Sequence, residues 1–417
     1  MSATLTAPAP ASDFARPPDG LWFGKDLSTP EPIPEAAIER AVALMRSGRL
    51  HRYGEQGSGY PEPSLLEQDY AAYVGSKYCV AVNSCGAAMF IALKALDVKP
   101  SDKVLTSTFT LAPVPGAIAH AGAVAVLIET TADYMTDLAD LAHKAATSGA
   151  KVFLLSHMRG HIADLQAVKA ICDKHGIAII EDCAHTMGAK WDGQHTGTWG
   201  RVGCYSAQTY KHINAGEGGL LVTDDDDVAA QAILMSGAYM MYDQHILKPA
   251  PEVFERWKYV TPNFSMRMSN LAASLLRPQI GQLAERGQRW NHIYSALARE
   301  LCKARYVSVP ARDAKEEFIA SSIQFTLDLT PPQIERFLNE CSLRGLYVKW
   351  FGAATPVAFT SNYEHWHYLQ SKPDIPKSKT VLNQLMDLRT PLSLTPDDCE
   401  LIGQIVASAT SIAGASD

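Results

Sequence analysis

The stretch that decides the fold spans residues 177–223 and reads IAIIEDCAHTMGAKWDGQHTGTWGRVGCYSAQTYKHINAGEGGLLVT. Three short apolar runs in it have the length of buried strands: 177–180, 202–205 and 220–223. The first run leads into Asp182, the second into Ser206, and Lys211 lies in the Gly-rich turn before the third. In open α/β sheets the chemistry gathers at the carboxyl ends of strands. We therefore expect an acid, a hydroxyl and an amine to converge there.

The amine and the acid have complementary chemistry. A lysine held among apolar strands loses hydration, which lowers its pKa and leaves an amine able to attack a carbonyl. If that carbonyl belongs to pyridoxal phosphate, a buried carboxylate is needed opposite it to keep the ring nitrogen protonated. Lys211 and Asp182 are the candidates for these catalytic roles. For an isolated pair, a capping aspartate and a solvated turn lysine would be the better interpretation.

Four linked segments carry a family resemblance: Glu181-Asp182-Cys183-Ala184-His185, the pair Gly197 and Gly200, Tyr205-Ser206 followed by Lys211, and Gly216-Glu217-Gly218-Gly219. In this order and spacing they resemble the DegT/StrS-type (sugar) aminotransferases, a branch of the fold type I pyridoxal phosphate enzymes. The resemblance covers most of the chain. It implies transfer of an amino group from a donor such as glutamate or glutamine to a ketone or aldehyde, commonly a keto sugar. It also implies a homodimer with shared active sites.

The wider pattern predicts an α/β fold. Seven apolar runs alternate with amphipathic helical stretches, which predicts a seven-stranded, mostly parallel sheet covered on both faces. We expect a flexible N-terminal arm (1–34), a large cofactor-binding domain (35–290) and a smaller C-terminal α/β domain (291–417). In the C-terminal part the pattern predicts strands at 323–329 and 346–351 and helices at 331–344, 377–387 and 396–407.

Composition excludes several other classes of protein. The 417 residues carry a net charge of −7 without a basic cluster, which disfavours a nucleic-acid partner. No apolar run approaches the roughly 20 residues that span a bilayer, so we expect no membrane association. Eight scattered cysteines without a CxxC motif indicate free thiols in a reducing, cytoplasmic compartment. We assign no metal site.

The cofactor phosphate has a candidate cradle after the predicted strand at 78–83. The turn Ser84-Cys85-Gly86 leads into an Ala-rich helix, and a helix N-terminus presents free amides to an anion. Ser84 could instead be a simple N-cap. The resembled family carries Ser-Gly-Thr here, so this chain keeps the amides but loses a threonine hydroxyl. We expect the amides of Gly86 and Ala87 and the hydroxyls of Ser84 and Ser206 to hold the phosphate, with Cys85 in the same turn.

Three further residues are cofactor candidates by the resemblance. Leu111 stands where the family usually has an aromatic residue on the cofactor ring, so a stacking contribution of about 1 kcal/mol is lost. His185 can cover the other face of the ring, or can be a core histidine. Ser265 takes the place of an asparagine that, in the family, reaches the partner subunit's cofactor phosphate.

Two residues are candidates for binding substrate. Arg159 follows the fourth predicted strand, where the family usually has an uncharged residue. It could grip a carboxylate, sulfonate or phosphate, or it could be a surface arginine paired with an acid. His212 follows Lys211 directly. The aromatic-rich segment 239–259, with His245, could line the substrate entrance or pack on the surface.

Two other functions stay open. In the sugar dehydratase branch of the family the lysine is replaced by histidine, so Lys211 argues against that reaction although His212 is adjacent. The other open interpretation is a non-catalytic regulator on the same fold that binds the cofactor or another ligand. The intact pair of Asp182 and Lys211 disfavours it.

Overall fold

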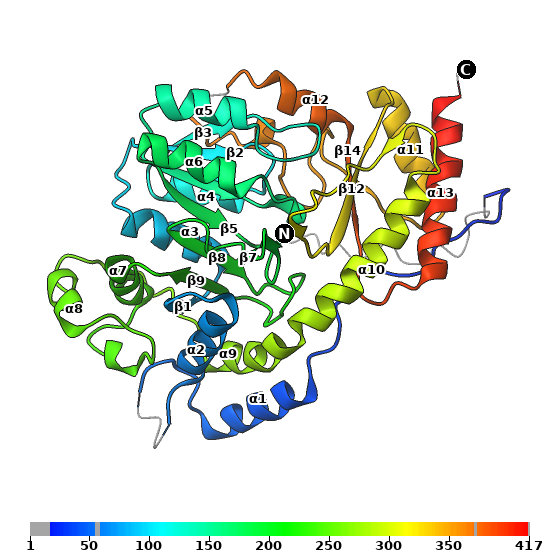
Figure 1. Ribbon diagram of the computed structural model, residues 1–417. Helices are drawn as coiled ribbons and strands as arrows, with labels where there is room; N and C mark the ends of the chain where they lie inside the picture. Colours follow the sequence, from blue (N-terminus) through cyan, green and yellow to red (C-terminus); the bar gives the residue numbers. More distant parts are fainter. Residues whose placement is uncertain (1–16, 55–58, 371–372, 416–417) are drawn as a thin grey trace.

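The computed structural model describes residues 17–54, 59–370 and 373–415. A seven-stranded sheet in the order β1-β9-β8-β5-β4-β2-β3 forms its centre (Figure 1). The strands are β1 (Tyr78–Val82), β2 (Lys103–Ser107), β3 (Val124–Ile128), β4 (Val152–Ser156), β5 (Ala178–Asp182), β8 (Val202–Ser206) and β9 (Gly219–Thr223). Pairing is parallel from β8 through β3, and β9 runs antiparallel to both of its neighbours. The predicted α/β fold with a seven-stranded, mostly parallel sheet is confirmed.

Helices cover both faces of this sheet. One face packs against α3 (Cys85–Ala95), α4 (Pro113–His120) and α7 (Asp226–Ser236). The other packs against α5 (Leu138–Thr147), α6 (Leu165–His175), α2 (Glu62–Val74) and α9 (Asn270–Leu276). Strand alternation supplies both cores: in β4, Val152 and Leu154 enter the first, whereas Phe153 and Leu155 enter the second. The strands are mostly apolar because both faces are buried.

The register of the central strands places the polar residues together. Asp182, at the end of β5, lies beside Ser156 of β4 and Cys204 of β8. Ser206 ends β8 opposite Gly219. A Cβ on Gly219 would collide with the backbone of Ser84, so this glycine lets β9 begin against the N-terminus of α3. Three strand ends and one helix start therefore meet at one edge.

A second, four-stranded sheet lies beside the first, in the order β10-β12-β14-β13. Its strands are β10 (Val307–Ser308), β12 (Ser322–Leu327), β13 (Lys349–Trp350) and β14 (Leu385–Arg389). Helices α10 (Leu283–Leu301), α11 (Pro331–Leu343) and α13 (Pro396–Gly414) pack with it. Helix α10 continues across residue 290, so one helix spans the expected domain boundary. The division into domains stays a prediction.

One predicted helix is wrong in its last part. Helix α12 (Pro376–Gln384) stops before residue 387, and β14 begins at Leu385. This strand pairs with β12 on one side and β13 on the other, and residues 385–388 are buried. Tertiary pairing overrides local helical spacing here. The strand expected at 346–351 is also shorter, with only two residues in β13.

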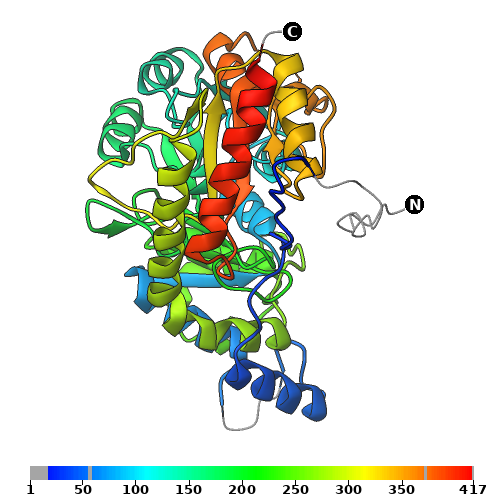
Figure 2. The same cartoon turned by 90° about the vertical axis from the view of Figure 1, so that its right-hand side faces the viewer.

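The described part of the expected arm packs against the second sheet unit. Phe23 is buried in the core of that unit, and its N–H donates to the carbonyl of Arg344 at 2.8 Å. From there the segment runs along the molecule to α1 (Glu35–Ser47), which projects at the end away from the C-terminus (Figures 1 and 2). Residues 1–16 lie outside the described residues.

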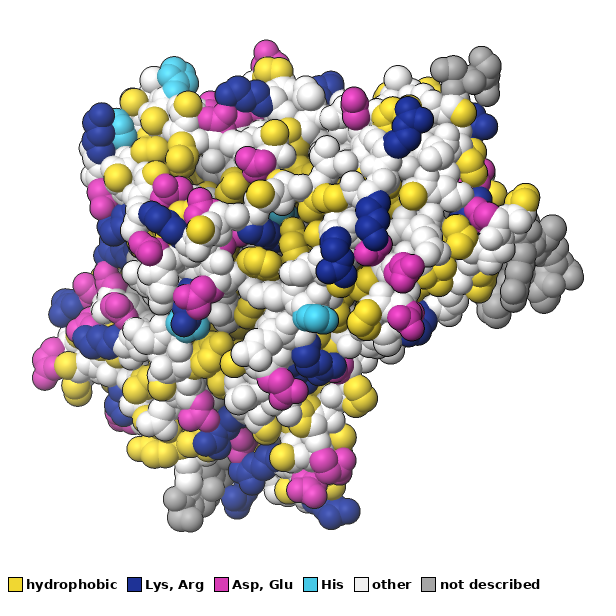
Figure 3. Space-filling view, turned by 45° about the vertical axis from the view of Figure 1, so that its right-hand side comes forward, with side chains coloured by type: hydrophobic (Ala, Val, Ile, Leu, Met, Phe, Trp, Pro, Cys, Tyr) yellow, Lys and Arg dark blue, Asp and Glu magenta, His cyan; other side chains and the backbone are white. Residues whose placement is uncertain are grey.

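The remaining elements are short: β6 (Lys190–Trp191), β7 (Gln194–His195) and β11 (Glu316–Glu317), which form a small sheet, helix α8 (Pro251–Trp257), and the 3₁₀ turns η1 (Met158–Gly160), η2 (Tyr242–Gln244), η3 (Arg277–Gln282) and η4 (Tyr363–His365). Acidic and basic side chains are interspersed over the face in Figure 3. None of the helices in the described ranges is long and apolar enough to cross a membrane.

Candidate active site

Lys211 lies in the turn between β8 and β9 and points into the polar edge of the sheet. Its Nζ donates to Nε2 of His185 at 3.0 Å. The pKa of Lys211 is lowered to about 8: burial is the largest cause, the charge of Arg159 acts in the same direction, and the charge of Asp182 opposes the decrease. Burial also lowers the pKa of His185 well below its usual range, so this ring is a neutral acceptor. About a tenth of the amine is therefore unprotonated at pH 7, far more than for a lysine with the ordinary pKa.

Asp182 is buried at the end of β5 with one acceptor position to spare. Its Oδ2 accepts from the hydroxyl of Ser156 at 2.8 Å. Its Oδ1 accepts from the N–H of Ala184 at 3.1 Å, and the Sγ of Cys85 lies 3.8 Å from the same oxygen. A carboxylate has about four lone-pair positions, so these three contacts leave room for one more donor. The site thus holds an oriented carboxylate near the amine.

The turn at residues 84–86 is an N-cap as well as a candidate cradle. The Oγ of Ser84 accepts from the N–H of Ala87 at 3.0 Å, so the amide of Ala87 is not a free donor, contrary to our expectation. The N–H groups of Cys85 and Gly86 belong to the first turn and have no intrahelical acceptor. A Cβ on Gly86 would meet only the Ser84 hydroxyl, at 3.7 Å, which leaves space above the turn.

Ser206 completes the cradle from the side of β8. It is buried, and its Oγ accepts a long hydrogen bond of 3.4 Å from the N–H of Gln208. The hydroxyl proton of Ser206 is therefore available to an incoming anion. Two helix amides and one hydroxyl at a helix N-terminus suit a phosphate group.

Two other predicted cofactor residues lie farther from these contacts. Leu111 is half-buried in the loop after β2, where it packs against a cluster that contains Phe109. Ser265 is exposed, with a φ of 56°, and its Oγ accepts from Arg267 at 3.3 Å. The carboxylate, the amine, the anion cradle and the neutral ring of His185 together fit pyridoxal phosphate in charge and hydrogen bonding.

Arg159 is buried and paired. It lies in η1 with a φ of 57°, and its Nη2 donates to Oδ2 of Asp387 at 2.7 Å. The sequence also allowed a surface arginine paired with an acid. Arg159 does pair with an acid, but the pair is buried. Asp387 balances the charge of Arg159, while the buried Nε of this arginine has no hydrogen-bond partner among the described residues.

His212 and Trp290 form one wall of a small cavity of about 80 Å³ beside Lys211. The two rings meet edge to face with centroids 5.1 Å apart. Burial lowers the pKa of His212 to about 3, so the ring is neutral. Its packing against Trp290 explains its position, and its role toward substrate stays a prediction.

Arg389 is a site residue that sequence reasoning missed. It ends β14, lines the same cavity as Lys211, and its guanidinium carbon lies 3.9 Å from the centre of the Tyr210 ring. The apolar residues of 385–388 were the available signal for this strand, but the predicted helix at 377–387 obscured it. Because the helix predicted at 377–387 replaced strand β14, the sequence did not place Arg389 at the site.

His245, in the segment 239–259, does not line a substrate entrance. His245 is fully buried, with Nδ1 3.0 Å from Oε2 of Glu67 and Nε2 2.7 Å from the hydroxyl of Tyr53. Arg52 donates to the same Glu67 oxygen at 2.7 Å. This buried network holds the segment after α1 against the large sheet.

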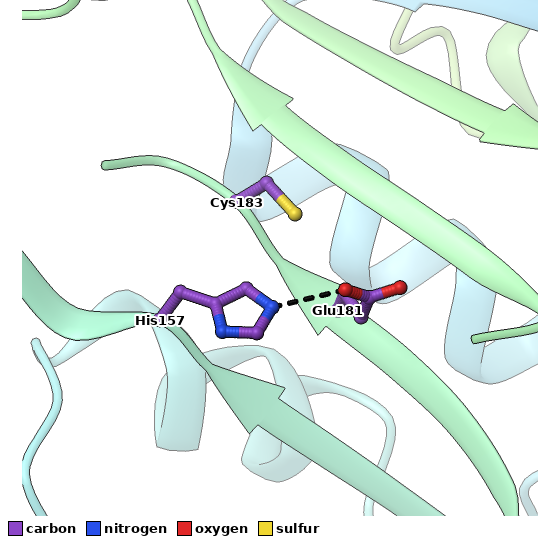
Figure 4. Close-up of side chains that lie close together, drawn as sticks. All are labelled: His157, Glu181 and Cys183. Atoms are coloured by element: carbon purple, nitrogen blue, oxygen red, sulfur yellow. Dashed lines mark hydrogen bonds and ion pairs between the residues drawn. The ribbon is translucent and has the colours of Figure 1, made fainter. Parts of the chain in front are cut away.

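Three potential metal ligands lie together in Figure 4: His157, Glu181 and Cys183. Glu181 accepts from Nε2 of His157 at 3.0 Å. It also accepts from the backbone N–H groups of Gly197, Trp199 and Gly200, at 2.7–2.8 Å. Four donors use all of the lone-pair positions of the carboxylate. Glu181 thus fixes the loop at 197–200, and we call this set of hydrogen bonds the clamp. Because Gly197 and Gly200 both donate to Glu181, their spacing needs no metal ion to explain it.

Comparison with known proteins agrees with this geometry. The model of the DegT/DnrJ/EryC1/StrS aminotransferase family matches residues 33–407. The spore coat polysaccharide biosynthesis protein SpsC of Bacillus subtilis (strain 168) is 30% identical over 269 residues, which are 63% of this chain and 65% of SpsC, so the match spans less than two thirds of that relative.

Solved structures show the same fold. The aminotransferase TlmJ from Streptoalloteichus hindustanus superposes with a TM-score of 0.78 at 20% identity, over 92% of this chain and 98% of that one. The 3-amino-5-hydroxybenzoic acid synthase does so with a TM-score of 0.78 at 23% identity, with the same coverage. Since the family match extends over most of the sequence, this chain belongs to the DegT/DnrJ/EryC1/StrS aminotransferase family.

Proposed function

We propose that this protein is a pyridoxal-phosphate-dependent aminotransferase. It would move an amino group from an amino donor, glutamate or glutamine, to a ketone or aldehyde acceptor of the keto-sugar class. The observation that carries the proposal is the amine of Lys211, with a pKa lowered to about 8, in the same polar site as the buried carboxylate of Asp182. The name of SpsC, which refers to polysaccharide biosynthesis, supports a sugar-linked acceptor.

Each residue of the site has a distinct task. Pyridoxal phosphate, when bound, supplies an aldehyde carbonyl and an electron-withdrawing ring. Asp182 uses its remaining lone pair to accept the ring N–H and holds that proton in place. The amides of Cys85 and Gly86 and the hydroxyl of Ser206 bind the phosphate, while Ser84 fixes the turn by capping α3.

Lys211 has two tasks: it anchors the cofactor and it moves the proton at the α-carbon of the substrate. A general base is most effective when its pKa lies near the working pH, and burial brings this amine into that range. His185, neutral and 3.0 Å from Nζ, orients the amine. His185 and Leu111 would pack against the cofactor ring.

The lysine also favours transamination over dehydration. The dehydratase branch requires a histidine in place of the lysine, and His212 packs against Trp290 instead of taking that place. A regulator that only binds ligand has no use for an amine with a lowered pKa. Both arguments support the aminotransferase.

We propose further that the protein acts as a homodimer with shared active sites in the cytoplasm. Ser265, the predicted contact to the partner's phosphate, is exposed, and large apolar side chains near it in the chain are exposed as well: Tyr239 (52%), Tyr259 (80%) and Val260 (69%). Such apolar exposure is typical of an interface. Each of the eight cysteines is a free thiol, which supports a reducing compartment. Light scattering at two protein concentrations measures the dimer.

The visible absorption spectrum tests the main proposal. Wild type and Lys211→Ala are compared with added pyridoxal phosphate, before and after L-glutamate or L-glutamine, and Lys169→Ala, at an exposed lysine, is the control. After unbound cofactor is removed, we expect a visible band in wild type and control that the donor bleaches, and no such band in Lys211→Ala. If the wild type keeps no band after incubation with excess cofactor, the proposal is wrong. Equal thermal unfolding midpoints show that the variants are folded.

A further inference from the structure

The two carboxylate oxygens of Asp182 differ in their hydrogen bonds. Oδ1 accepts from the N–H of Ala184 at 3.1 Å and from the thiol of Cys85, whose Sγ lies 3.8 Å away. Burial raises the pKa of that thiol well above its usual range, so the thiol stays a neutral donor. Among the described residues, Oδ2 accepts only from the hydroxyl of Ser156, at 2.8 Å. Since each oxygen has two lone pairs, the free position lies on Oδ2.

The donor to Oδ2 is itself held by a second hydroxyl. Ser156 ends β4 directly beside Asp182 in the register of the sheet, and its Oγ accepts from Oγ1 of Thr110 at 2.8 Å. Both hydroxyl residues are buried. An ionised carboxylate only accepts, so Ser156 must give its proton to Asp182 and has only lone pairs left for Thr110. These contacts form a hydroxyl relay that runs in one direction, from Thr110 through Ser156 to Asp182.

The hydroxyl relay joins elements that are distant in sequence. The N–H of Ser156 donates to Oγ of Ser107, at the end of β2, at 3.3 Å, and this Oγ lies 3.3 Å from Oγ1 of Thr136. Thr110 lies in the loop that follows β2. Buried hydroxyls need partners whatever their function, so packing alone would account for the contact between Thr110 and Ser156. Packing does not account for the end point of the relay, the carboxylate oxygen that keeps a free lone pair.

We propose that Ser156, supported by Thr110, is a positioning residue that orients the free lone pair of Asp182 Oδ2 for the ring N–H of the cofactor. The assignment rests on the pyridoxal-phosphate-dependent function proposed above. Because the Ser156 proton occupies one lone pair of Oδ2, it leaves a single direction for the ring N–H. Hydrogen bonds in a chain polarise one another, so the Thr110 hydroxyl strengthens the bond from Ser156 to Asp182.

Two ligands that differ at one ring position test the assignment. The deaza analogue of pyridoxal phosphate keeps the aldehyde and the phosphate but has a C–H group in place of the ring nitrogen. Calorimetric titration of the full chain, freed of cofactor, measures the dissociation constant of each ligand without catalysis. We expect the wild type to bind pyridoxal phosphate about tenfold or more tightly than the analogue. In Ser156→Ala the constant for pyridoxal phosphate should rise about tenfold, whereas that for the analogue should stay within about twofold.

Variants at Thr110 separate the hydroxyl from the shape of the side chain. Thr110→Val keeps the shape but removes the donor to Ser156, and it should weaken binding of pyridoxal phosphate about threefold without change for the deaza analogue. Thr110→Ser keeps the hydroxyl and should bind both ligands as the wild type does. Thr106→Val is the matched control, because the buried hydroxyl of Thr106 donates to the carbonyl of Leu154 at 2.9 Å. This variant should change neither constant.

A double-mutant cycle shows whether Ser156 acts through Asp182. In Asp182→Ala the carboxylate is absent, so a further Ser156→Ala change should alter the dissociation constant of pyridoxal phosphate by less than about twofold. An equal loss from Ser156→Ala in both backgrounds would mean that Ser156 acts by another route, and the inference would be wrong. Thermal unfolding curves show that each variant is folded. If Ser156→Ala does not fold, the comparison of Thr110→Val with Thr110→Ser decides.

The outcomes separate this inference from the proposed function. If the wild type binds pyridoxal phosphate and forms the visible band, but Ser156→Ala binds both ligands as the wild type does, the positioning role is overturned while the aminotransferase stands. Equal weakening of both ligands would assign Ser156 to the shape of the pocket and would also overturn the role. A wild type that binds the two ligands equally would place Asp182 away from the ring nitrogen, with the same result. If the wild type binds no pyridoxal phosphate, the proposed function fails and this inference fails with it.

Discussion

Arg159 and Asp387 form a buried ion pair between the two sheet units, with Nη2 2.7 Å from Oδ2. Arg159 follows β4 of the large sheet, and Asp387 lies in β14 of the small one. The other oxygen of Asp387 accepts from Gln324 of β12. Asp387 also acts on Lys349, whose pKa burial lowers to about 8 against the opposing charge of Asp387. One carboxylate thus balances cations from both units.

Replacement of this carboxylate should destabilise the protein strongly. Asp387→Asn keeps the shape of the side chain but leaves the buried guanidinium of Arg159 without a counter-charge. Loss of one partner of a buried pair costs about 3–5 kcal/mol. We expect a decrease of that size in the free energy of unfolding, measured by urea denaturation.

The control for this prediction is Asp173→Asn, in the exposed pair of Lys169 and Asp173. Exposed pairs contribute about 0–1 kcal/mol, so this variant should change little. Equal effects of Asp387→Asn and Asp173→Asn would contradict the argument that Asp387 balances buried charge.

Glu67 should make the stability of the protein depend on pH in the acid range. Burial, the largest single effect, raises the pKa of Glu67, but the charges of Arg52 and His245 and the hydrogen bonds from both together outweigh it, and the pKa falls to about 2, from 4.5 in the unfolded chain. The stabilisation is therefore complete above pH 4.5 and is lost as the pH falls toward 2. Two to three pKa units correspond to about 3 kcal/mol.

Urea denaturation between pH 3 and 6 measures this contribution. Glu67→Gln should flatten the acid limb of the stability curve, and it should also lower stability at pH 7 because Arg52 remains buried. A variant at an exposed acid, Glu317→Gln, should keep the wild-type pH dependence. If both variants keep the acid limb, Glu67 is not its source.

The large sheet could be predicted from sequence because its strands are continuous apolar runs. Burial on both faces leaves few polar positions within the strands, so runs such as Val152–Ser156 differ clearly from the helices between them. The polar residue that ends each run then identified Asp182 and Ser206. The lysine followed from its place in the glycine-rich turn.

The second unit was harder for a physical reason. Strand β14 is held by pairing with β12 and β13, which are distant in sequence, so local spacing across 377–387 gave the wrong element and concealed Arg389. The buried network around Glu67 also depends on contacts between residues distant in sequence. Arg52 and His245 are hydrogen-bonded although 193 residues separate them. Hydrogen bonds between such distant residues leave no periodic signal in the sequence.

The clamp at Glu181 should stabilise the loop at 197–200 without a metal ion. In Glu181→Gln, one amide N–H₂ would face N–H donors, leaving at least one buried donor without an acceptor. The cost is about 1–3 kcal/mol. We expect a lower thermal unfolding midpoint in Glu181→Gln and no change in the exposed variant Glu317→Gln.

Chelation separates the clamp from a metal site. If Glu181 is saturated by N–H donors, excess EDTA should leave the unfolding midpoint of the wild type unchanged. A decrease on chelation that zinc reverses would show instead that His157, Glu181 and Cys183 hold an ion.

Lys211 should capture a carbonyl with a pH dependence set by its own amine. Only the unprotonated amine attacks, and burial lowers the pKa of Lys211 to about 8. The rate of covalent capture of pyridoxal phosphate should therefore rise about tenfold per pH unit below 7 and level off above 8. Borohydride trapping followed by peptide mass measures the rate at Lys211 and, as an internal control, at exposed Lys169.

Because the charge of Asp182 raises the pKa of Lys211, Asp182→Asn should move the midpoint of the capture rate to lower pH. A midpoint near 10.5 in the wild type would show that the amine is solvated, and the electrostatic basis of the proposed catalysis would be lost.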